Sequence, residues 1–183
     1  MLRTSQAIAA GIHPRTLYHL RDSGKVSVVS RGVYRLSDLP DLENPDLAVV
    51  AARIPTAIVC MVSALAWHRI TTQVPHRVDI ALPRGAERPR VEHPPLRVFR
   101  FTKALLEPGV ETHLIEGMHL KVYSPARTVA DCFRFRNRIG LDVAVEGLRA
   151  CLRERKTTNA KILHFARLLR VEKVILPYLE AGR

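Results

Sequence analysis

The first 36 residues constrain the fold most strongly, because proline, glycine and apolar spacing mark four successive elements there. Residues 4–12 end in Gly11-Ile12 and predict a short helix closed by a tight turn. Pro14 suits the first position of a second helix that runs to Asp22. Valine-rich runs on either side of Ser30-Arg31-Gly32 predict a β-hairpin. This order is typical of a winged helix-turn-helix, which places its second helix in a DNA major groove.

Polar residues of the second helix and of the hairpin are the candidates for DNA contact. Arg15 can bind guanine with two hydrogen bonds, and Thr16 can meet a phosphate or a thymine methyl group. Arg31, at the tip of the hairpin, suits a phosphate or a narrow minor groove. The predicted DNA-binding residues are Arg15, Thr16, Tyr18, His19, Lys25, Arg31 and Arg35. We expect Tyr34 to pack inside the module.

The predicted module departs from the usual pattern at its start. A winged helix normally has a further helix before the helix-turn-helix, and here the sequence opens inside the second one. Either the native start lies upstream of Met1, or the small core is completed from elsewhere in the chain.

The charge balance agrees with a nucleic-acid partner. The 183 residues carry 29 Lys and Arg against 17 Asp and Glu, a net charge of +12, which attracts polyanions and raises their encounter rate. Three separated cysteines, Cys60, Cys132 and Cys151, predict buried reduced thiols and a cytoplasmic protein rather than a disulfide framework. The longest apolar run, residues 57–67, is too short to span a bilayer, and no secretory leader is recognisable.

A proline-rich linker, residues 37–45, precedes a second predicted domain. The chain therefore reads as α+β, with the module at residues 1–40 and a mixed α/β domain at residues 41–183. The second domain is expected to combine a small sheet with a helical C-terminal third. Its expected helices are 45–53, 60–67, 124–133, 141–153 and 157–169, and its expected strands are 77–82, 96–101, 112–115 and 119–123.

Two further groups of charged residues are candidate sites. Arg84, Arg88 and Arg90 lie in a basic loop that either is solvated or touches nucleic acid. The second group, residues 127–134, places Arg127, Asp131 and Arg134 on one helix face. These three either form a ladder of ion pairs or line a site, and the ladder is favoured.

Familiar catalytic patterns are absent from the sequence. It contains no phosphate-binding GxxxxGK[ST] loop, no GxGxxG, no HExxH and no GxSxG. Asp79 could open a metal-nuclease site, but no acid-x-Lys pair follows it on the next expected strand. We therefore predict neither a metal nor a cofactor.

The combined motifs resemble the AbiEi-type antitoxins of bacterial abortive-infection, type IV toxin–antitoxin systems. The N-terminal motifs are residues 9–12 (AAGI), 15–18 (RTLY) and 31–34 (RGVY). The C-terminal motifs are residues 79–85 (DIALPRG) and 122–133 (VYSPARTVADCF), which continue into residues 136–142.

This resemblance implies a non-enzymatic repressor that binds double-stranded DNA at its own promoter. It also implies a functional partner, a nucleotidyltransferase-like toxin, without a stable complex, and an antitoxin role for the second domain. A dimer on DNA is compatible with this scheme. Two alternatives remain open from the residues: a nuclease-like enzyme using Asp79 or Asp131, and a protein-interaction module that has lost DNA binding.

Overall fold

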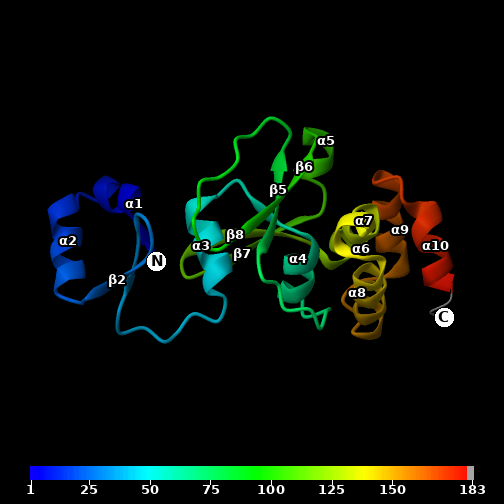
Figure 1. The fold of residues 1–183 in the computed structure, drawn as a ribbon, viewed down its shortest axis with the longest axis horizontal. Helices are drawn as coiled ribbons and strands as arrows, with labels where there is room; N and C mark the ends of the chain where they lie inside the picture. The colour runs from blue at the N-terminus through cyan, green and yellow to red at the C-terminus, as the bar shows by residue number, and fades with distance from the viewer. Residues whose placement is uncertain (181–183) are drawn as a thin grey trace.

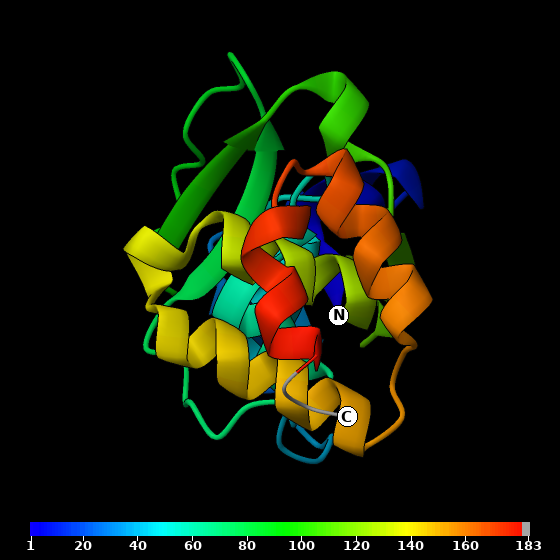
Figure 2. The same ribbon diagram turned by 90° about the vertical axis from the view of Figure 1, so that its right-hand side faces the viewer.

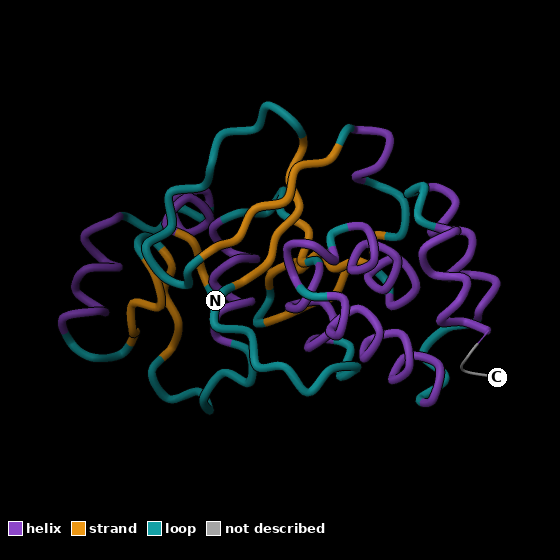
Figure 3. Tube along the Cα trace, turned by 45° about the vertical axis from the view of Figure 1, so that its right-hand side comes forward, coloured by secondary structure: helices purple, strands orange, loops and turns teal. Residues whose placement is uncertain are grey.

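The computed structural model describes residues 1–180 and arranges them in three parts along the long axis of the molecule. The N-terminal helices and hairpin lie at one end, a mixed sheet lies in the middle, and the C-terminal helices form the other end (Figure 1). The tube in Figure 3 shows the strands between two groups of helices. The protein is therefore mixed α+β, as the sequence predicts.

Residues 1–40 form two short helices and a three-stranded antiparallel sheet. The strand order is β1 (Leu2–Arg3), β3 (Val33–Leu36), β2 (Val26–Ser30). Helices α1 (Thr4–Ala9) and α2 (Pro14–Asp22) connect β1 to β2. The sequence analysis missed β1, because two residues become a strand only by pairing with a distant partner.

A small apolar cluster holds the two helices on the hairpin. It buries Ala7 of α1, Leu17 of α2 and Tyr34 of β3. The packing position expected for Tyr34 is thus confirmed, with only 7% of the residue exposed. Because Leu17 points inward and Leu20 is half-buried, the polar residues on the other sides of α2 remain exposed.

A five-stranded mixed sheet forms the middle of the molecule, in the order β6-β5-β4-β8-β7. The β5–β6 and β4–β8 pairs are parallel, whereas β4–β5 and β7–β8 are antiparallel. The strands are β4 (Ile58–Val59), β5 (Val78–Pro83), β6 (Leu96–Phe101), β7 (Val110–Ile115) and β8 (Met118–Tyr123).

Both faces of this sheet are buried, because successive side chains of a strand point to opposite faces. Ile80 and Val122 face a cluster with α3 (Pro45–Arg53). Their neighbours Ala81 and Tyr123 face the larger cluster formed with the C-terminal helices. Two-sided burial explains why β5 reads as an almost continuous apolar run.

The remaining helices cover the second face and the end of the molecule (Figure 2). Here α6 packs against α4, α8 and α9. These helices are α4 (Met61–Trp67), α5 (Lys103–Leu106), α6 (Pro125–Arg134), α7 (Arg136–Ile139), α8 (Leu141–Arg153), α9 (Asn159–Leu168) and α10 (Glu172–Glu180). All three cysteines are buried free thiols, as predicted.

The N-terminal hairpin shares a core with the second part of the chain. Val33 of β3 is buried in the same cluster as Leu47 and Val50 of α3, and Met1 and Val29 pack against that cluster. The face of the small N-terminal sheet that carries Val33 thus packs against α3, whereas the face that carries Tyr34 packs against α1 and α2. This packing agrees with one of the two alternatives raised by the sequence, in which the small core is completed from elsewhere in the chain.

Replacing Gly109 by Ala tests how tightly β7 approaches the helices. Gly109 has φ +82°, and an added Cβ would lie 2.8 Å from Arg127 Cβ and 2.9 Å from Phe165 Cζ. Gly85 has the same φ with nothing within 4 Å of an added Cβ. We expect Gly109→Ala to cost about 1–3 kcal/mol of unfolding free energy beyond the cost of Gly85→Ala, measured in urea. Equal losses would show that only the backbone conformation matters.

Candidate nucleic-acid interface

The exposed face of α2 carries the residues predicted to read DNA. The His13 side chain accepts a hydrogen bond from the Arg15 backbone N–H at 3.2 Å and so caps the helix N-terminus. Arg15, Thr16, Tyr18 and His19 are all exposed. Four predicted residues therefore share one free helix surface near its first turns.

The C-terminal end of α2 has a different environment. Arg21 forms an ion pair with Asp22 at 2.8 Å, and its guanidinium lies 5.3 Å from the centre of the Tyr18 ring. Asp22 is the ion-pair partner that raises the pKa of Arg21, through a hydrogen bond and charge attraction. The guanidinium of Arg21 thus already has an ion-pair partner within the helix, whereas no ion pair involves Arg15 in the described chain.

Two more predicted contacts lie at the two ends of β2. Lys25 is exposed where the chain leaves α2, and Arg31 is exposed at the turn between β2 and β3. Gly32 adopts φ +73° in this turn, a conformation that glycine tolerates. The hairpin thereby presents Arg31 at its tip.

Arg53, which the sequence analysis did not select, connects the hairpin turn to the second part of the chain. It extends from the end of α3, where its guanidinium donates to the Arg31 carbonyl and, at 3.4 Å, to the Arg90 carbonyl. Arg31, Arg53 and Arg90 line a hollow of about 600 Å³, which we call the hairpin hollow; Glu92 and His93 lie at it too. No local motif marks Arg53, because its partners lie 22 and 37 residues away.

Arg3 adds a further positive charge beside the same turn. A smaller hollow of about 290 Å³ is lined by Arg3, Thr4, Arg31 and Arg53, among others. The Nε atom of Arg3 is buried without a hydrogen-bond partner among residues 1–180. Four arginines, Arg3, Arg31, Arg53 and Arg90, therefore surround the hairpin turn.

Arg35 occupies a different position from the other predicted DNA contacts. Its Nε donates to Glu116 Oε2 at 3.2 Å, and its other nitrogens donate to the carbonyls of Leu39 and Pro40. Only 10% of its side chain is exposed. Through these hydrogen bonds Arg35 connects the hairpin to the β7–β8 turn and to the linker.

The three arginines of the basic loop lie in different places. Arg90 lies at the hairpin hollow, whereas Arg88 lines a second hollow beside β6. The backbone N–H of Arg84 donates to Phe101 at the end of β6, and its side chain is exposed. The structure therefore does not bring these three side chains together.

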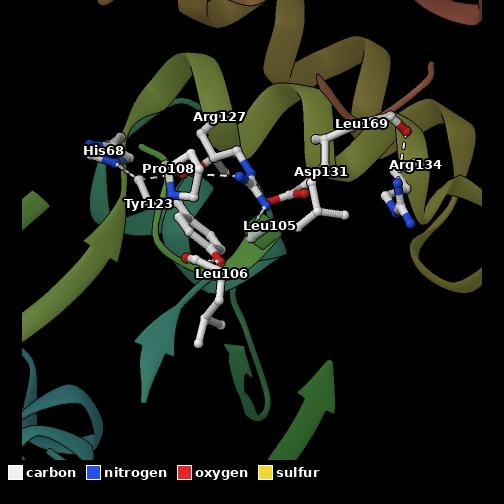
Figure 4. Close-up of polar contacts among 10 residues, drawn as sticks. His68, Leu105, Leu106, Pro108, Tyr123, Arg127, Asp131, Arg134 and Leu169 are labelled. Carbon is white, nitrogen blue, oxygen red and sulfur yellow. Dashed lines mark hydrogen bonds and ion pairs between the residues drawn. The ribbon is translucent and has the colours of Figure 1, made fainter. Parts of the chain in front are cut away.

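Arg127 and Asp131 are fully buried, and the predicted ion pair between them is present (Figure 4). Arg127 Nε donates to Asp131 Oδ2 at 2.9 Å, while Nη1 and Nη2 donate to the carbonyls of Pro108 and Leu105 at 3.0 and 2.7 Å. The guanidinium also lies 4.5 Å from the centre of the Tyr123 ring. This pair is enclosed in the core, away from any partner.

Arg134, the third member of that group, is partly buried on the same helix. Its Nη1 donates to the Leu169 carbonyl at 2.8 Å, which ties α6 to the end of α9 (Figure 4). In the described chain Arg134 forms no ion pair, so the predicted ladder is limited to Arg127 and Asp131.

Burial raises the pKa of Asp131 to about 6, although Arg127 opposes the shift. Asp131 Oδ1 has no hydrogen-bond partner in the described part of the chain. Removal from water disfavours the charged carboxylate, and a single donor from Arg127 does not fully compensate.

Asp79 is also enclosed. Arg97 binds it with two hydrogen bonds of 2.6 Å, and the Val62 N–H donates to it at 3.1 Å. Among residues 1–180, no three His, Cys, Asp or Glu side chains are grouped closely enough to hold a metal ion. No helix in this range has both the length and the apolar character to cross a membrane.

Replacing Asp131 by Asn tests the raised pKa. A carboxyl group whose pKa is higher in the folded state stabilises the fold below the unfolded value near 4, and this contribution is lost as pH rises through about 6. The Asp131→Asn variant does not titrate at this position. Relative to it, the unfolding free energy of the native protein should rise by up to about 3 kcal/mol as the pH is lowered from 7 to 4. Melting temperatures of both proteins across this range provide the measurement. A constant difference would contradict the raised pKa.

The comparison with known families bears on the segment that carries the exposed α2 face. Residues 1–37 match the family model described as transcriptional regulator, AbiEi antitoxin. The search of curated proteins gave no significant match. The matched range runs from β1 through the end of β3, including the helices and the hairpin. Over residues 1–37, therefore, this chain is recognised as similar to the AbiEi antitoxin and transcriptional-regulator family.

Proposed function

We propose that this protein is a DNA-binding antitoxin that represses its own operon in a type IV toxin–antitoxin system. Residues 1–40 act as a winged helix-turn-helix, and residues 41–183 neutralise the effect of a nucleotidyltransferase-like toxin. The protein acts by binding, without a catalytic step or a cofactor. Two observations carry the proposal together: the polar face of α2 is exposed, and four arginines lie at the hairpin turn.

Base readout is assigned to the first turns of α2. In helix-turn-helix proteins the N-terminal residues of the second helix contact base edges. Arg15 and Thr16 occupy that position, and Tyr18 and His19 lie farther along the exposed surface. Arg15 suits guanine, because its planar fork matches the two acceptors of that base.

Phosphate contacts are assigned to the basic residues around the hairpin. Lys25 and Arg31 are exposed, and the structure adds Arg3 and Arg53 beside Arg31. Guanidinium groups bind phosphate with paired hydrogen bonds and fix the register of the protein on the duplex. In this proposal Arg35 holds the hairpin in place rather than contacting DNA, because each of its three nitrogens already donates within the protein and its side chain is largely buried.

The first test is fluorescence anisotropy with the DNA upstream of the gene, compared with a scrambled duplex over a salt series. We expect tight binding to the upstream DNA that weakens steeply with salt, since released counterions accompany each phosphate contact. The stoichiometry on DNA would report whether two copies occupy paired half-sites. Weak and equal binding to both duplexes would contradict the repressor function and favour a protein-interaction module.

Arg15→Ala separates base readout from charge. We expect it to weaken binding to the upstream DNA by about 1–3 kcal/mol and to leave the scrambled duplex nearly unaffected. The control is Arg21→Ala, which removes the same charge from the same helix at an ion-paired position. Equal losses on both duplexes for Arg15→Ala would refute its role as a base reader.

The antitoxin function is tested by co-expression with the toxin encoded beside the gene. We expect the full chain to restore growth, and an Arg15→Ala/Arg31→Ala variant to restore it equally well while losing repression. This separation follows because both residues belong to the DNA-binding surface in the first 40 residues. A failure of the native chain to restore growth would refute the antitoxin function and leave the repressor function standing.

A further inference from the structure

Five arginines gather on the outer side of strand β6, far along the chain from the candidate DNA-reading helix. They line a hollow of about 520 Å³, which we call the β6 hollow. Its lining residues are Arg77, Arg88, Leu96, Arg97, Val98, Arg100 and Arg138. Strand β6 is an edge of the sheet, since it pairs only with β5. No residue of the first 40 lines this hollow.

Three of these arginines are held in place by contacts within the protein. Arg97 is fixed by its two hydrogen bonds to buried Asp79, and Arg100 Nη1 donates to the Pro83 carbonyl at 3.1 Å. The Arg138 guanidinium lies 4.4 Å from the centre of the Phe99 ring. The contacts of Arg100 and Arg138 orient their planar groups before any ligand arrives, which lowers the entropy cost of binding. The paired donors of Arg97 are already used by Asp79, so this arginine borders the hollow without offering a free fork.

The positive charge of the β6 hollow is neutralised locally only at Arg97 among the described residues. None of its lining residues is acidic, and Asp79 is the only carboxylate that forms an ion pair with one of its arginines in the described chain. The neighbouring Arg134 and Arg136 behave differently, because their donors bind the carbonyls of Leu169 and Phe133. Those two arginines close the ends of helices, whereas Arg138 extends to the hollow.

We propose that the β6 hollow binds adjacent phosphate groups, supplied either by a free nucleotide or by a nucleic-acid strand. Arginine forks donate paired, charge-assisted hydrogen bonds to the tetrahedral phosphate oxygens. Several forks around one hollow favour a ligand with two or more neighbouring negative charges over a single anion. The site does not depend on DNA binding by residues 1–40.

The test is calorimetric titration of the full chain with inorganic tripolyphosphate. The variant Arg88→Gln/Arg138→Gln removes two exposed charges from the hollow. Its control, Arg149→Gln/Arg153→Gln, removes two exposed charges from a separate groove along α8. We expect the first variant to bind tripolyphosphate on the order of tenfold more weakly and the control to bind within about twofold of the native protein.

Other results would overturn the site. Equal weakening in both variants would show general charge attraction, and the absence of measurable binding by the native protein up to about 1 mM would show that no site exists. Unfolding curves establish that both variants are folded. If the double variant unfolds, Arg138→Lys replaces it, because lysine keeps the charge and loses the stacked fork. Unchanged binding by a folded variant would refute the proposal.

Two further titrations identify the source of the phosphates. ATP and a short single-stranded RNA are titrated into the native protein and the Arg88→Gln/Arg138→Gln variant. If the variant loses only ATP binding, the ligand of the β6 hollow is a free nucleotide. If it loses only RNA binding, the ligand is a nucleic-acid strand. Binding of upstream duplex DNA is measured in parallel, so that failure of this site is distinguishable from failure of the repressor function.

Discussion

The buried guanidinium of Arg127 is the interaction on which the second part of the chain depends. It joins α6 to α5 through the Leu105 carbonyl and to the α5–β7 connection through the Pro108 carbonyl, and it pairs with Asp131 one turn along its own helix. Removing the Arg127 guanidinium would leave Asp131 and the Leu105 and Pro108 carbonyls without their donor in the core, and breaking a buried pair in this way typically costs about 3–5 kcal/mol of unfolding free energy. The close approach at Gly109 follows from the same arrangement, because the Arg127 side chain and Phe165 fill the space beside it.

A second constraint couples the proposed DNA-binding surface to the rest of the molecule. The hairpin shares apolar packing with α3, Arg53 donates to the hairpin turn, and Arg35 pairs with Glu116 of the β7–β8 turn. These contacts fix the hairpin from both the core and the surface. A partner that displaces the β7–β8 turn or the end of α3 would therefore alter the DNA-binding surface as well.

The arginines of this basic chain fall into two physical groups. In one group the donors are used inside the protein, as in Arg35, Arg127 and Arg134, and these side chains connect elements that are distant in sequence. In the other group, which includes Arg15, Arg31 and Arg138, the side chains are exposed. Only the second group suits anionic partners, so net charge alone overstates the surface available to nucleic acid.

The sequence by itself determined the local elements and the identity of the α2 surface. Apolar spacing, Pro14 and Pro125 located the main helices, and alternation located the hairpins and strands, because these signals act over a few residues. Only the tertiary structure decided the two-residue strands β1 and β4, the contribution of Arg53 to the hairpin turn, and the burial of Arg127 with Asp131. Each of these depends on partners far along the chain, and no local pattern records which distant groups meet when the core closes.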